Sequence, residues 1–352
     1  MSVRVLVVDD SAFMRKAISM MLEGDPEIEV IGTARDGLEA IEKVKELEPD
    51  LMTLDVEMPR MDGITALKKI MKENPLPVLM VSSLTVEGAR ATIDAMSAGA
   101  VDFIPKQLSY VSLDITKIKD DLIAKVKAIT RNRSRIFLRP FSNRTSPAQR
   151  SPALKSVSAQ IVTIGISTGG PFSLQKVIPS LPENFPLPVA IVQHMPPHFT
   201  KSLAERLDSI SRVEVCEAEE GMELTKGKVF IAPGGLHMKF RRSGAKVLIS
   251  TSKDPADSLH RPSVDVMFTS AFDTFGGKIL AAVMTGMGKD GLEGSKLIKS
   301  AGGKVVAQNE ESCVVYGMPK AIVDAELADA IVPLEEMAST LTSAVSISSA
   351  LD

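Results

Sequence analysis

The chain has few of the residues on which several functional classes depend. Its 352 residues include no tryptophan, two tyrosines, two cysteines and four histidines. So few large aromatic side chains argue against a stacking platform for single-stranded nucleic acid. Cys216 and Cys313 lie far apart and form no CxxC motif. This spacing favours two reduced thiols over a disulfide or a metal site.

The sequence also lacks the features of an exported or membrane-inserted protein. Met1 leads directly into an apolar strand pattern, without the charged, apolar and cleavage regions of a signal peptide. No apolar run approaches the ~20 residues that are needed to span a bilayer. We therefore expect a cytoplasmic protein with no membrane insertion.

Charge is unevenly distributed, although the net charge is only −3. Residues 1–130 hold 16 basic and 22 acidic residues, residues 131–156 hold seven basic and no acidic residues, and the rest hold 18 and 22. The middle stretch also contains the loop-forming pairs Arg139-Pro140, Ser146-Pro147 and Ser151-Pro152. The length of the chain favours two domains. We interpret 131–156 as a basic linker between domains at 1–130 and 157–352.

The first domain alternates strand and helix patterns. Apolar, β-branched runs predict strands at 3–8, 28–34, 50–54, 78–81 and 102–104. Apolar residues at helical spacing predict helices at 12–22, 38–47, 64–72, 87–97 and about 115–129. Such alternation is typical of a doubly wound parallel α/β sheet, here flavodoxin-like.

A second alternation begins at Gln160 and predicts another α/β domain, Rossmann-like and mainly parallel. Strands are expected at 161–166, 188–193, 228–232, 238–240, 246–251, 278–285 and 304–308, some of them in a hairpin. Helices are expected at 171–178, 200–207 and 263–274, in a segment ending near residue 300, and at the end of the chain.

Chemically active side chains stand at the ends of strands in the first domain. Asp9 and Asp10 follow one strand, and Asp55, Ser82 and Lys106 each follow another. The carboxyl ends of parallel strands meet at one edge of a sheet, so these groups should converge. Clustered carboxylates suit Mg²⁺. A carboxylate beside a metal can also attack phosphorus and form an acyl phosphate. The alternative is that the acids cap the helices that follow them.

Ser167 follows an apolar strand within the segment Gly165-Ile166-Ser167-Thr168-Gly169-Gly170. A tight strand-to-helix turn would expose its hydroxyl, and the helix N-terminus offers unpaired N–H groups. A serine of this kind can act as a nucleophile if a base accepts its proton. The same spacing also suits a Rossmann-like turn that only binds phosphate.

The base must come from the four histidines. His194 ends a strand at the same sheet edge as Ser167 and is the best candidate. For His198, His237 and His260 we expect surface or structural roles; the prolines between His194 and His198 exclude a helical metal pair. Asp290, in a glycine-rich loop after a strand, would orient the imidazole. It could equally cap the helix ahead of Leu292.

Residues 1–125 resemble a response-regulator receiver domain. The resemblance implies that Asp55 is the phosphoacceptor and that Asp10 and Asp55 bind Mg²⁺. It also implies that the backbone carbonyl of Glu57 completes the protein ligands, with Asp9 beside them.

The same resemblance assigns a switch mechanism. Ser82 matches the switch hydroxyl, Phe103 the switch aromatic and Lys106 the phosphate-contacting lysine. Gln107 departs from the family, which usually has proline after that lysine, often in a cis bond. A cis bond before Gln107 would cost ~3 kcal/mol.

Residues 161–332 resemble the catalytic domain of the chemotaxis receptor methylesterase (CheB) family. The resemblance rests on the segments 165–170, 193–197 and 285–291, in that order behind a receiver. It implies a triad of Ser167, His194 and Asp290. We expect Thr168, Gly169 and Met287 to line the pocket or the oxyanion site, and no cofactor in this domain.

The family resemblance implies a serine hydrolase that demethylates glutamate methyl esters on the cytoplasmic helices of chemoreceptors and deamidates specific glutamines there. It further implies activation by phosphorylation from the chemotaxis histidine kinase. Two alternatives remain. A DNA-binding response regulator is supported only by the basic linker, and no helix-turn-helix pattern accompanies it, so we expect no nucleic-acid partner. The other alternative is an inactive interaction module.

Overall fold

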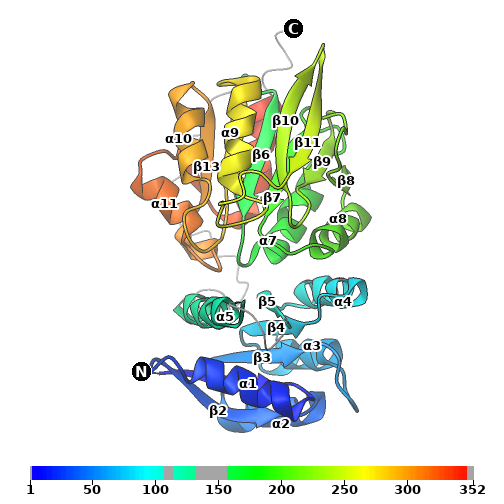
Figure 1. Cartoon of the computed structure of the whole chain (residues 1–352), viewed down its shortest axis with the longest axis vertical. Coiled ribbons are helices and arrows are strands. Elements are labelled where there is room, and N and C mark those ends of the chain that lie inside the picture. The colour runs from blue at the N-terminus through cyan, green and yellow to red at the C-terminus, as the bar shows by residue number, and fades with distance from the viewer. Residues whose placement is uncertain (1, 107–113, 132–156, 347–352) are drawn as a thin grey trace. The chain divides into compact units, whose positions relative to one another are not determined.

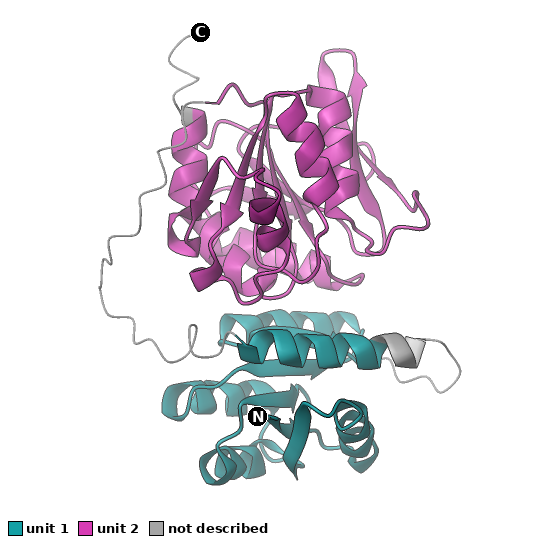
Figure 2. Cartoon of the chain, turned by 90° about the vertical axis from the view of Figure 1, so that its left-hand side faces the viewer, with its two compact units in different colours: residues 1–142 teal, residues 143–352 magenta. Residues whose placement is uncertain are grey.

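The computed structural model of the chain describes residues 2–106, 114–131 and 157–346. The chain divides into two compact units, Met1–Ser142 and Asn143–Asp352, which are coloured separately in Figure 2. Arg131, where we expected the linker to begin, is the last residue of a helix. The rest of the predicted linker, residues 132–156, lies outside the described residues.

The first unit alternates strands and helices (Figure 1). Its strands are β1 (Val3–Val8), β2 (Ile28–Ala34), β3 (Leu51–Asp55), β4 (Val78–Ser82) and β5 (Asp102–Pro105). Its helices are α1 (Ala12–Leu22), α2 (Gly37–Leu47), α3 (Gly63–Glu73), α4 (Val86–Ser97) and α5 (Asp114–Arg131). The strands pair in parallel in the order β2-β1-β3-β4-β5. The predicted doubly wound sheet is confirmed.

Burial and capping explain where these elements begin and end. Strands β3 and β4 are buried along their whole length, as expected for apolar runs covered on both faces. Each following helix begins at a side chain that accepts a hydrogen bond from a free backbone amide: Asp62 before α3 and Thr85 before α4. Ser11 caps α1 in the same way. The strand ends that carry the acidic residues are therefore held between a buried strand and a capped helix.

The second unit contains a larger sheet and a separate hairpin. The strands are β6 (Ile161–Ile166), β7 (Val189–Gln193), β8 (Glu214–Glu217), β9 (Lys228–Ile231), β10 (His237–Ser243), β11 (Lys246–Ser252), β12 (Ile279–Val283), β13 (Lys304–Gln308) and β14 (Ala330–Val332). The α-helices are α7 (Gly170–Val177), α8 (Phe199–Ile210), α9 (Val264–Phe275), α10 (Leu292–Ser300), α11 (Met318–Asp324) and α12 (Leu334–Ser346). Short 3₁₀ turns, η1 (Ile178–Ser180) and η2 (Glu310–Ser312), follow α7 and β13.

The sheet of the second unit is parallel, with strand order β14-β13-β12-β6-β7-β9-β8. This confirms the predicted mainly parallel domain, and β10 and β11 form the expected antiparallel hairpin. The sequence interpretation missed the edge strands β8 and β14. They have only four and three residues, too few for a clear alternation of apolar and polar side chains.

Helices cover both faces of this sheet. Helix α10 packs against α9 and α11 on one face, while α7 packs against α8 and α12 on the other (Figure 1). The chain winds from β6 to β7 in one direction and from β12 to β13 in the other. Loops that follow the central strands of such a sheet enclose a crevice at its carboxyl edge. The loops after β6, β7 and β12 therefore meet there.

Candidate functional site

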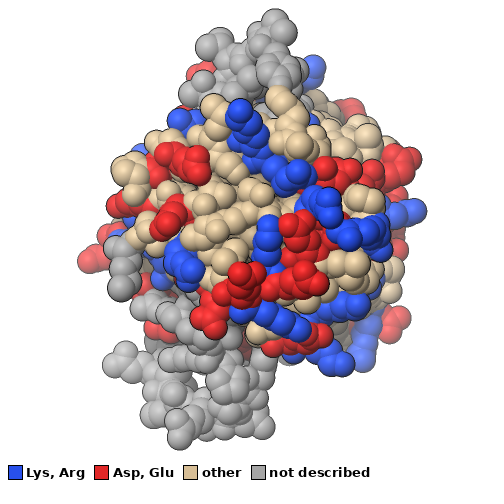
Figure 3. Space-filling view, turned by 90° about the horizontal axis from the view of Figure 1, so that it is seen from below, with Lys and Arg blue, Asp and Glu red and all other residues tan. Residues whose placement is uncertain are grey.

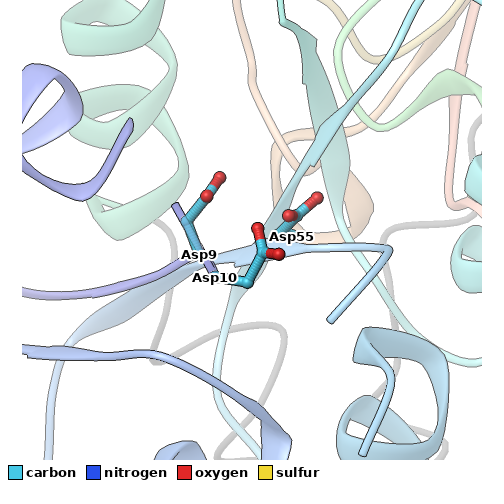
Figure 4. Close-up of side chains that lie close together, drawn as sticks. All are labelled: Asp9, Asp10 and Asp55. Atoms are coloured by element: carbon cyan, nitrogen blue, oxygen red, sulfur yellow. The ribbon is translucent and has the colours of Figure 1, made fainter. Parts of the chain in front are cut away.

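The acidic site of the first unit lies at the carboxyl ends of β1 and β3. Asp9 and Asp10 follow β1, and Asp55 is the last residue of β3. One carboxylate oxygen from each of the three lies within 4.8 Å of the others, and Figure 4 shows them gathered. Asp9 and Asp55 are buried while Asp10 is exposed. The three carboxylates therefore lie close together, as predicted from the sequence.

Lys106 is the cation that faces this cluster. Its Nζ lies 2.6 Å from Asp55 Oδ2 and 2.9 Å from Asp9 Oδ2. The pKa of Asp55 is raised to about 6, chiefly because the carboxyl is buried; the hydrogen bond from Lys106 opposes this rise and the charge of Asp9 adds to it. Burial alone would lower the pKa of Lys106, but its two carboxylate partners hold that pKa above its ordinary value. The single positive charge of Lys106 is therefore too small to neutralise the three carboxylates of the cluster.

The donor set of the cluster fits Mg²⁺. Its ligand atoms are all carboxylate oxygens, which hard cations prefer. Asp9 Oδ2 is buried and, apart from the ion-pair contact to Lys106, has no hydrogen-bond partner. Lys106 supplies one positive charge to three carboxylates, so a further cation would reduce the cost of burying Asp9 and Asp55. Glu57 lies exposed, two residues beyond the end of β3.

The two predicted switch residues are buried and turned to local partners. Ser82 Oγ donates to the Gly88 carbonyl at 3.1 Å. Phe103, in β5, is 4% exposed. Gln107 lies outside the described residues.

A partly buried lysine, Lys125, lies beside Phe103 and was not predicted from the sequence. Its Nζ donates to the Phe103 carbonyl at 2.9 Å and forms an ion pair with Asp102 at 3.0 Å. It also lies 5.7 Å from the centre of the Phe103 ring. Its position on the apolar side of an amphipathic helix was the signal that could have revealed it.

In the second unit, the turn after β6 presents Ser167. The Ser167 amide donates to the Thr285 carbonyl at 2.9 Å, and its carbonyl accepts from Gly170 at 2.7 Å. Gly169 has φ 77°, in the left-handed region that favours glycine. Gly286 is required by space, since a Cβ there would lie 2.8 Å from the Ser167 Cβ. Ser167 is thus held by backbone hydrogen bonds to the loop after β12 and to the first residue of α7.

His194 links Ser167 to Asp290. Its Nδ1 lies 3.1 Å from Ser167 Oγ, and its Nε2 lies 2.8 Å from Asp290 Oδ2. Because a carboxylate only accepts, the neutral imidazole must carry its hydrogen on Nε2, which leaves Nδ1 free to accept from the serine hydroxyl. The imidazole and the carboxylate are about nine-tenths buried, with 9% and 10% side-chain exposure.

Asp290 is anchored to the start of α9. It accepts hydrogen bonds from the Val264 amide at 2.7 Å, the Asp265 amide at 2.9 Å and the Ser263 hydroxyl at 3.0 Å. Burial alone would raise the pKa of Asp290, but the hydrogen bond and charge of His194, followed by these amides, hold that pKa well below its ordinary range. The alternative of a cap for α10 is wrong, because Gly291 is the N-cap and no side chain caps that helix.

The other three histidines occupy different environments. His260 stacks on His194, with ring centroids 4.1 Å apart and an interplanar angle of 19°. No sequence pattern indicates this contact, because a loop between a hairpin and a helix carries no periodicity. His237 is buried, and His198 is exposed at the start of α8.

The predicted pocket residues flank the serine. Thr168 is buried, with its carbonyl accepting from Thr285 Oγ1 at 2.9 Å, and Met287 is half-buried. Within the described residues, the backbone N–H groups of Thr168, Gly169 and Met287 donate to no backbone carbonyl. Backbone N–H groups on the loops that follow β6 and β12 are the kind of donor that stabilises an oxyanion.

The fold and the two sites define a class of protein: a receiver-type unit joined to a unit with a Ser–His–Asp arrangement. Two family models match the chain, the response regulator receiver domain over residues 5–116 and CheB methylesterase over residues 162–341. The chain belongs to the CheB methylesterase family.

Whole-chain relatives agree. A protein of Oleidesulfovibrio alaskensis named protein-glutamate methylesterase/protein-glutamine glutaminase 1 is 51% identical and covers 97% of this chain and 99% of its own. A protein of Pyrococcus abyssi with the same enzyme name is 48% identical over 97% and 94%. The crystal structure of the Thermotoga maritima CheB methylesterase catalytic domain is 46% identical, with a TM-score of 0.52, and covers 54% of this chain and 100% of its own.

Proposed function

We propose that this protein hydrolyses glutamate methyl esters on chemoreceptors and deamidates specific receptor glutamines, and that it does so under control of its receiver unit. The observation that carries the proposal is the continuous hydrogen-bonded arrangement from Ser167 through His194 to Asp290. The names of whole-chain relatives supply the substrate class.

The reaction follows from the direction of these hydrogen bonds. Ser167 Oγ attacks the ester carbonyl while His194 Nδ1 accepts the hydroxyl proton. Asp290 holds the imidazole and stabilises its positive charge. The N–H groups of Thr168, Gly169 and Met287 would bind the oxyanion, and donors of this kind are worth roughly 3 kcal/mol each.

Collapse of the intermediate completes the first half of the reaction. The C–O bond to the methoxy group breaks, and His194 returns its proton to the departing methanol. Water then adds to the acyl-enzyme with His194 as base, and its hydrolysis releases glutamate and restores Ser167. With a glutamine substrate the leaving group is ammonia, and the product is again glutamate.

In the receiver unit, we propose that Asp55 accepts a phosphoryl group from the chemotaxis histidine kinase. Asp10, Asp55 and the Glu57 carbonyl would hold Mg²⁺, with Asp9 beside them. When bound, the ion would neutralise phosphoryl charge. Lys106 already contacts Asp55 and would pair with the new phosphate.

The switch then follows from competition for the Ser82 hydroxyl. Ser82 Oγ would exchange its bond to the Gly88 carbonyl for one to the phosphate. Phe103 would shift with it, and we propose that this rearrangement raises hydrolase activity.

We propose a cytoplasmic protein whose partners are chemoreceptors and the kinase, with no nucleic acid. Among the described residues, no helix combines the length and apolar character needed to cross a membrane. The face seen in Figure 3 carries acidic and basic side chains side by side rather than a uniformly basic surface. On this face, the mixture differs from the basic footprint of a nucleic-acid-binding protein.

The test is methanol release from receptor membranes carrying methyl esters. Wild type, Ser167→Ala and Asp55→Asn are each assayed with and without a small-molecule phosphodonor and Mg²⁺. We expect Ser167→Ala to be inactive and Asp55→Asn to keep basal activity without stimulation. Full activity in Ser167→Ala would show that Ser167 is not the nucleophile. Normal stimulation in Asp55→Asn would show that Asp55 is not the phosphoacceptor.

A further inference from the structure

The hydrogen-bonded arrangement at the hydrolase site does not end at Asp290. Ser263 Oγ donates to Asp290 Oδ1 at 3.0 Å, and the Ser263 amide donates to His237 Nδ1 at 3.2 Å. His237 Nε2 lies 3.3 Å from the Pro255 carbonyl and, since a carbonyl only accepts, must donate to it. Ser263 and His237 are both buried, at 4% and 0% exposure. A buried path thus joins the base of the hairpin to the proposed triad.

Ser263 performs two tasks with one hydroxyl. As the N-cap of α9 it accepts a hydrogen bond from the Val266 amide at 3.4 Å, and as a donor it binds Asp290. The amides of Val264 and Asp265, which also bind Asp290, belong to the first turn that this cap begins. The position of Ser263 therefore sets the position of three of the donors that hold the carboxylate.

His237 fixes Ser263 from the opposite side. It is the first residue of β10, and its ring accepts the backbone N–H that no intrahelical carbonyl can reach at a helix start. Its other nitrogen holds the Pro255 carbonyl, in the segment 253–263 that also carries His260 over His194. Because both ring nitrogens are engaged, the imidazole is locked in one tautomer and one orientation.

We propose that Ser263 and His237 are positioning residues of the hydrolase: they hold the Asp290 carboxylate so that Oδ2 faces His194 and the imidazole is aligned with Ser167. Neither touches the substrate. Loss of this support would let Asp290 rotate, and a displacement of about 1 Å at a reacting group can cost on the order of 10²-fold in rate. This inference rests on the proposed hydrolase function.

Variants at Ser263 separate its two tasks. Ser263→Thr keeps both cap and donor, and Ser263→Ala removes both. Ser263→Asp keeps an excellent cap but cannot donate to a second carboxylate. Ser270→Ala is the matched control, because Ser270 lies on the same helix and its hydroxyl bonds the Phe240 amide of the hairpin at 2.8 Å.

Variants at His237 separate the acceptor from the bulk of the ring. His237→Asn places an amide oxygen near the position of Nδ1 and keeps the acceptor for Ser263. His237→Leu fills similar buried space without any acceptor. We expect His237→Leu to resemble Ser263→Ala in direction and His237→Asn to retain most activity.

The measurements are kcat and KM for methanol release in the full chain, unfolding midpoints, and the downfield proton resonance of the hydrogen bond between His194 Nε2 and Asp290. We expect Ser263→Ala and Ser263→Asp to lose about 10- to 100-fold in kcat with little change in KM. Their downfield resonance should shift or vanish. Ser263→Thr and Ser270→Ala should keep the wild-type kcat and the wild-type downfield resonance.

Each result bears on the inference. Equal kcat in Ser263→Ala and Ser270→Ala, or a normal downfield resonance in Ser263→Asp and His237→Leu, would overturn it. A loss in Ser263→Ala that Ser263→Thr does not restore would also overturn it, because a general packing defect would then be responsible. Activity that survives Ser167→Ala would instead sink the proposed function itself.

Discussion

The receiver site and the hydrolase site lie at equivalent places in two separate parallel sheets, yet they differ in how fully their polar groups are hydrogen-bonded within the protein. Each lies at the carboxyl ends of central parallel strands, where the winding direction reverses. Asp290 receives hydrogen bonds from two amides, a hydroxyl and an imidazole. Asp9 Oδ2, by contrast, is buried with only the ion-pair contact to Lys106.

This difference reflects what each site must do. A site that repeats one reaction benefits from groups that are already in place, since no reorganisation is then needed during the reaction. A site that reports on an incoming phosphoryl group must respond to it. Three carboxylates that share one lysine form a site whose charge balance changes when a cation or a phosphate arrives. In the proposed function, the hydrolase site is built by the chain alone, whereas the receiver site would be completed by Mg²⁺ and a phosphoryl group.

The substitution with the largest expected effect is Asp290→Asn, in the hydrolase site. An asparagine can present an N–H to His194 and favour the wrong tautomer, and a change of this kind costs about 10⁴-fold in kcat in serine hydrolases. We expect that loss in methanol release, with KM little changed. Asp273→Asn, an exposed change on α9, is the control. Equal activity of the two variants would show that Asp290 does not orient the base.

In the receiver site, Lys106 is the most informative residue to substitute. Lys106→Met leaves the buried carboxylates of Asp9 and Asp55 without their cation, and breaking a buried ion pair typically costs ~3 kcal/mol or more. We expect urea unfolding of the receiver unit at neutral pH to shift accordingly in chelator, with Mg²⁺ restoring part of the loss. Lys45→Met removes an exposed pair with Glu73 and should cost less than ~1 kcal/mol. Equal shifts in both variants would contradict this reading of the cluster.

Both sites also depend on a glycine that touches the reactive segment, and this similarity sharpens the comparison. A Cβ at Gly63 would lie 1.9 Å from the Asp55 carbonyl oxygen, and one at Gly286 would lie 2.4 Å from Met318 Sδ and 2.8 Å from Ser167 Cβ. The first contact bears on the backbone of β3 and hence on folding. The second bears on a side-chain position and hence on catalysis.

Gly286→Ala should therefore reduce activity more than stability. We expect roughly 10²-fold loss in kcat, because the serine must move from its place beside His194. Gly303→Ala is the control, since its Cβ would meet Ile298 Cγ2 at 2.5 Å, away from the site. The measurement is kcat together with the unfolding midpoint. If kcat falls no further in Gly286→Ala than in Gly303→Ala, the close approach has no catalytic consequence.

The residues at the strand ends could be predicted from the sequence because a single rule determines their positions. Apolar runs of five or six residues marked the strands, and the residue that followed each run had to lie at the same sheet edge. Asp9, Asp55, Ser167 and His194 all obey this rule. Residues whose partners come from loops or from a hairpin do not.

His260, Ser263 and Lys125 show why the rest could not be predicted. The stacking of His260 on His194 depends on how the segment 253–263 folds back, which neither periodicity nor a motif reveals. Ser263 is visible in the sequence as a possible helix cap, but not as a donor to a carboxylate 27 residues later. Lys125 pairs with Asp102 across the interface of a helix and a strand. Tertiary contacts of this kind are decided by packing.

The smallest expected effect is a dependence of stability on pH. It tests whether His237, at the buried end of the path that leads to Asp290, stays neutral in the folded protein. Burial lowers the pKa of His237 below its ordinary value of 6.5, the charges of Arg261 and Lys239 lower it further, and the Pro255 hydrogen bond and Asp290 oppose them. The unfolded chain therefore binds a proton near pH 6.5, where the folded chain does not. Below that pH the unfolded state gains protons first, so stability is present above pH 6.5 and falls as the pH drops.

Replacing the imidazole should remove this dependence. We expect wild type to lose up to about 1.4 kcal/mol of stability per pH unit below 6.5 from this group, and His237→Asn to show a flatter profile. Urea unfolding at several pH values between 5 and 7.5, with amide exchange in β6 and β12 to isolate the second unit, provides the measurement. His198→Asn, an exposed histidine, should follow wild type. A profile in His237→Asn that is as steep as wild type would mean that another group carries the acid sensitivity. The buried end of the path would then titrate freely, and the contrast between a self-sufficient site and a ligand-dependent one would weaken.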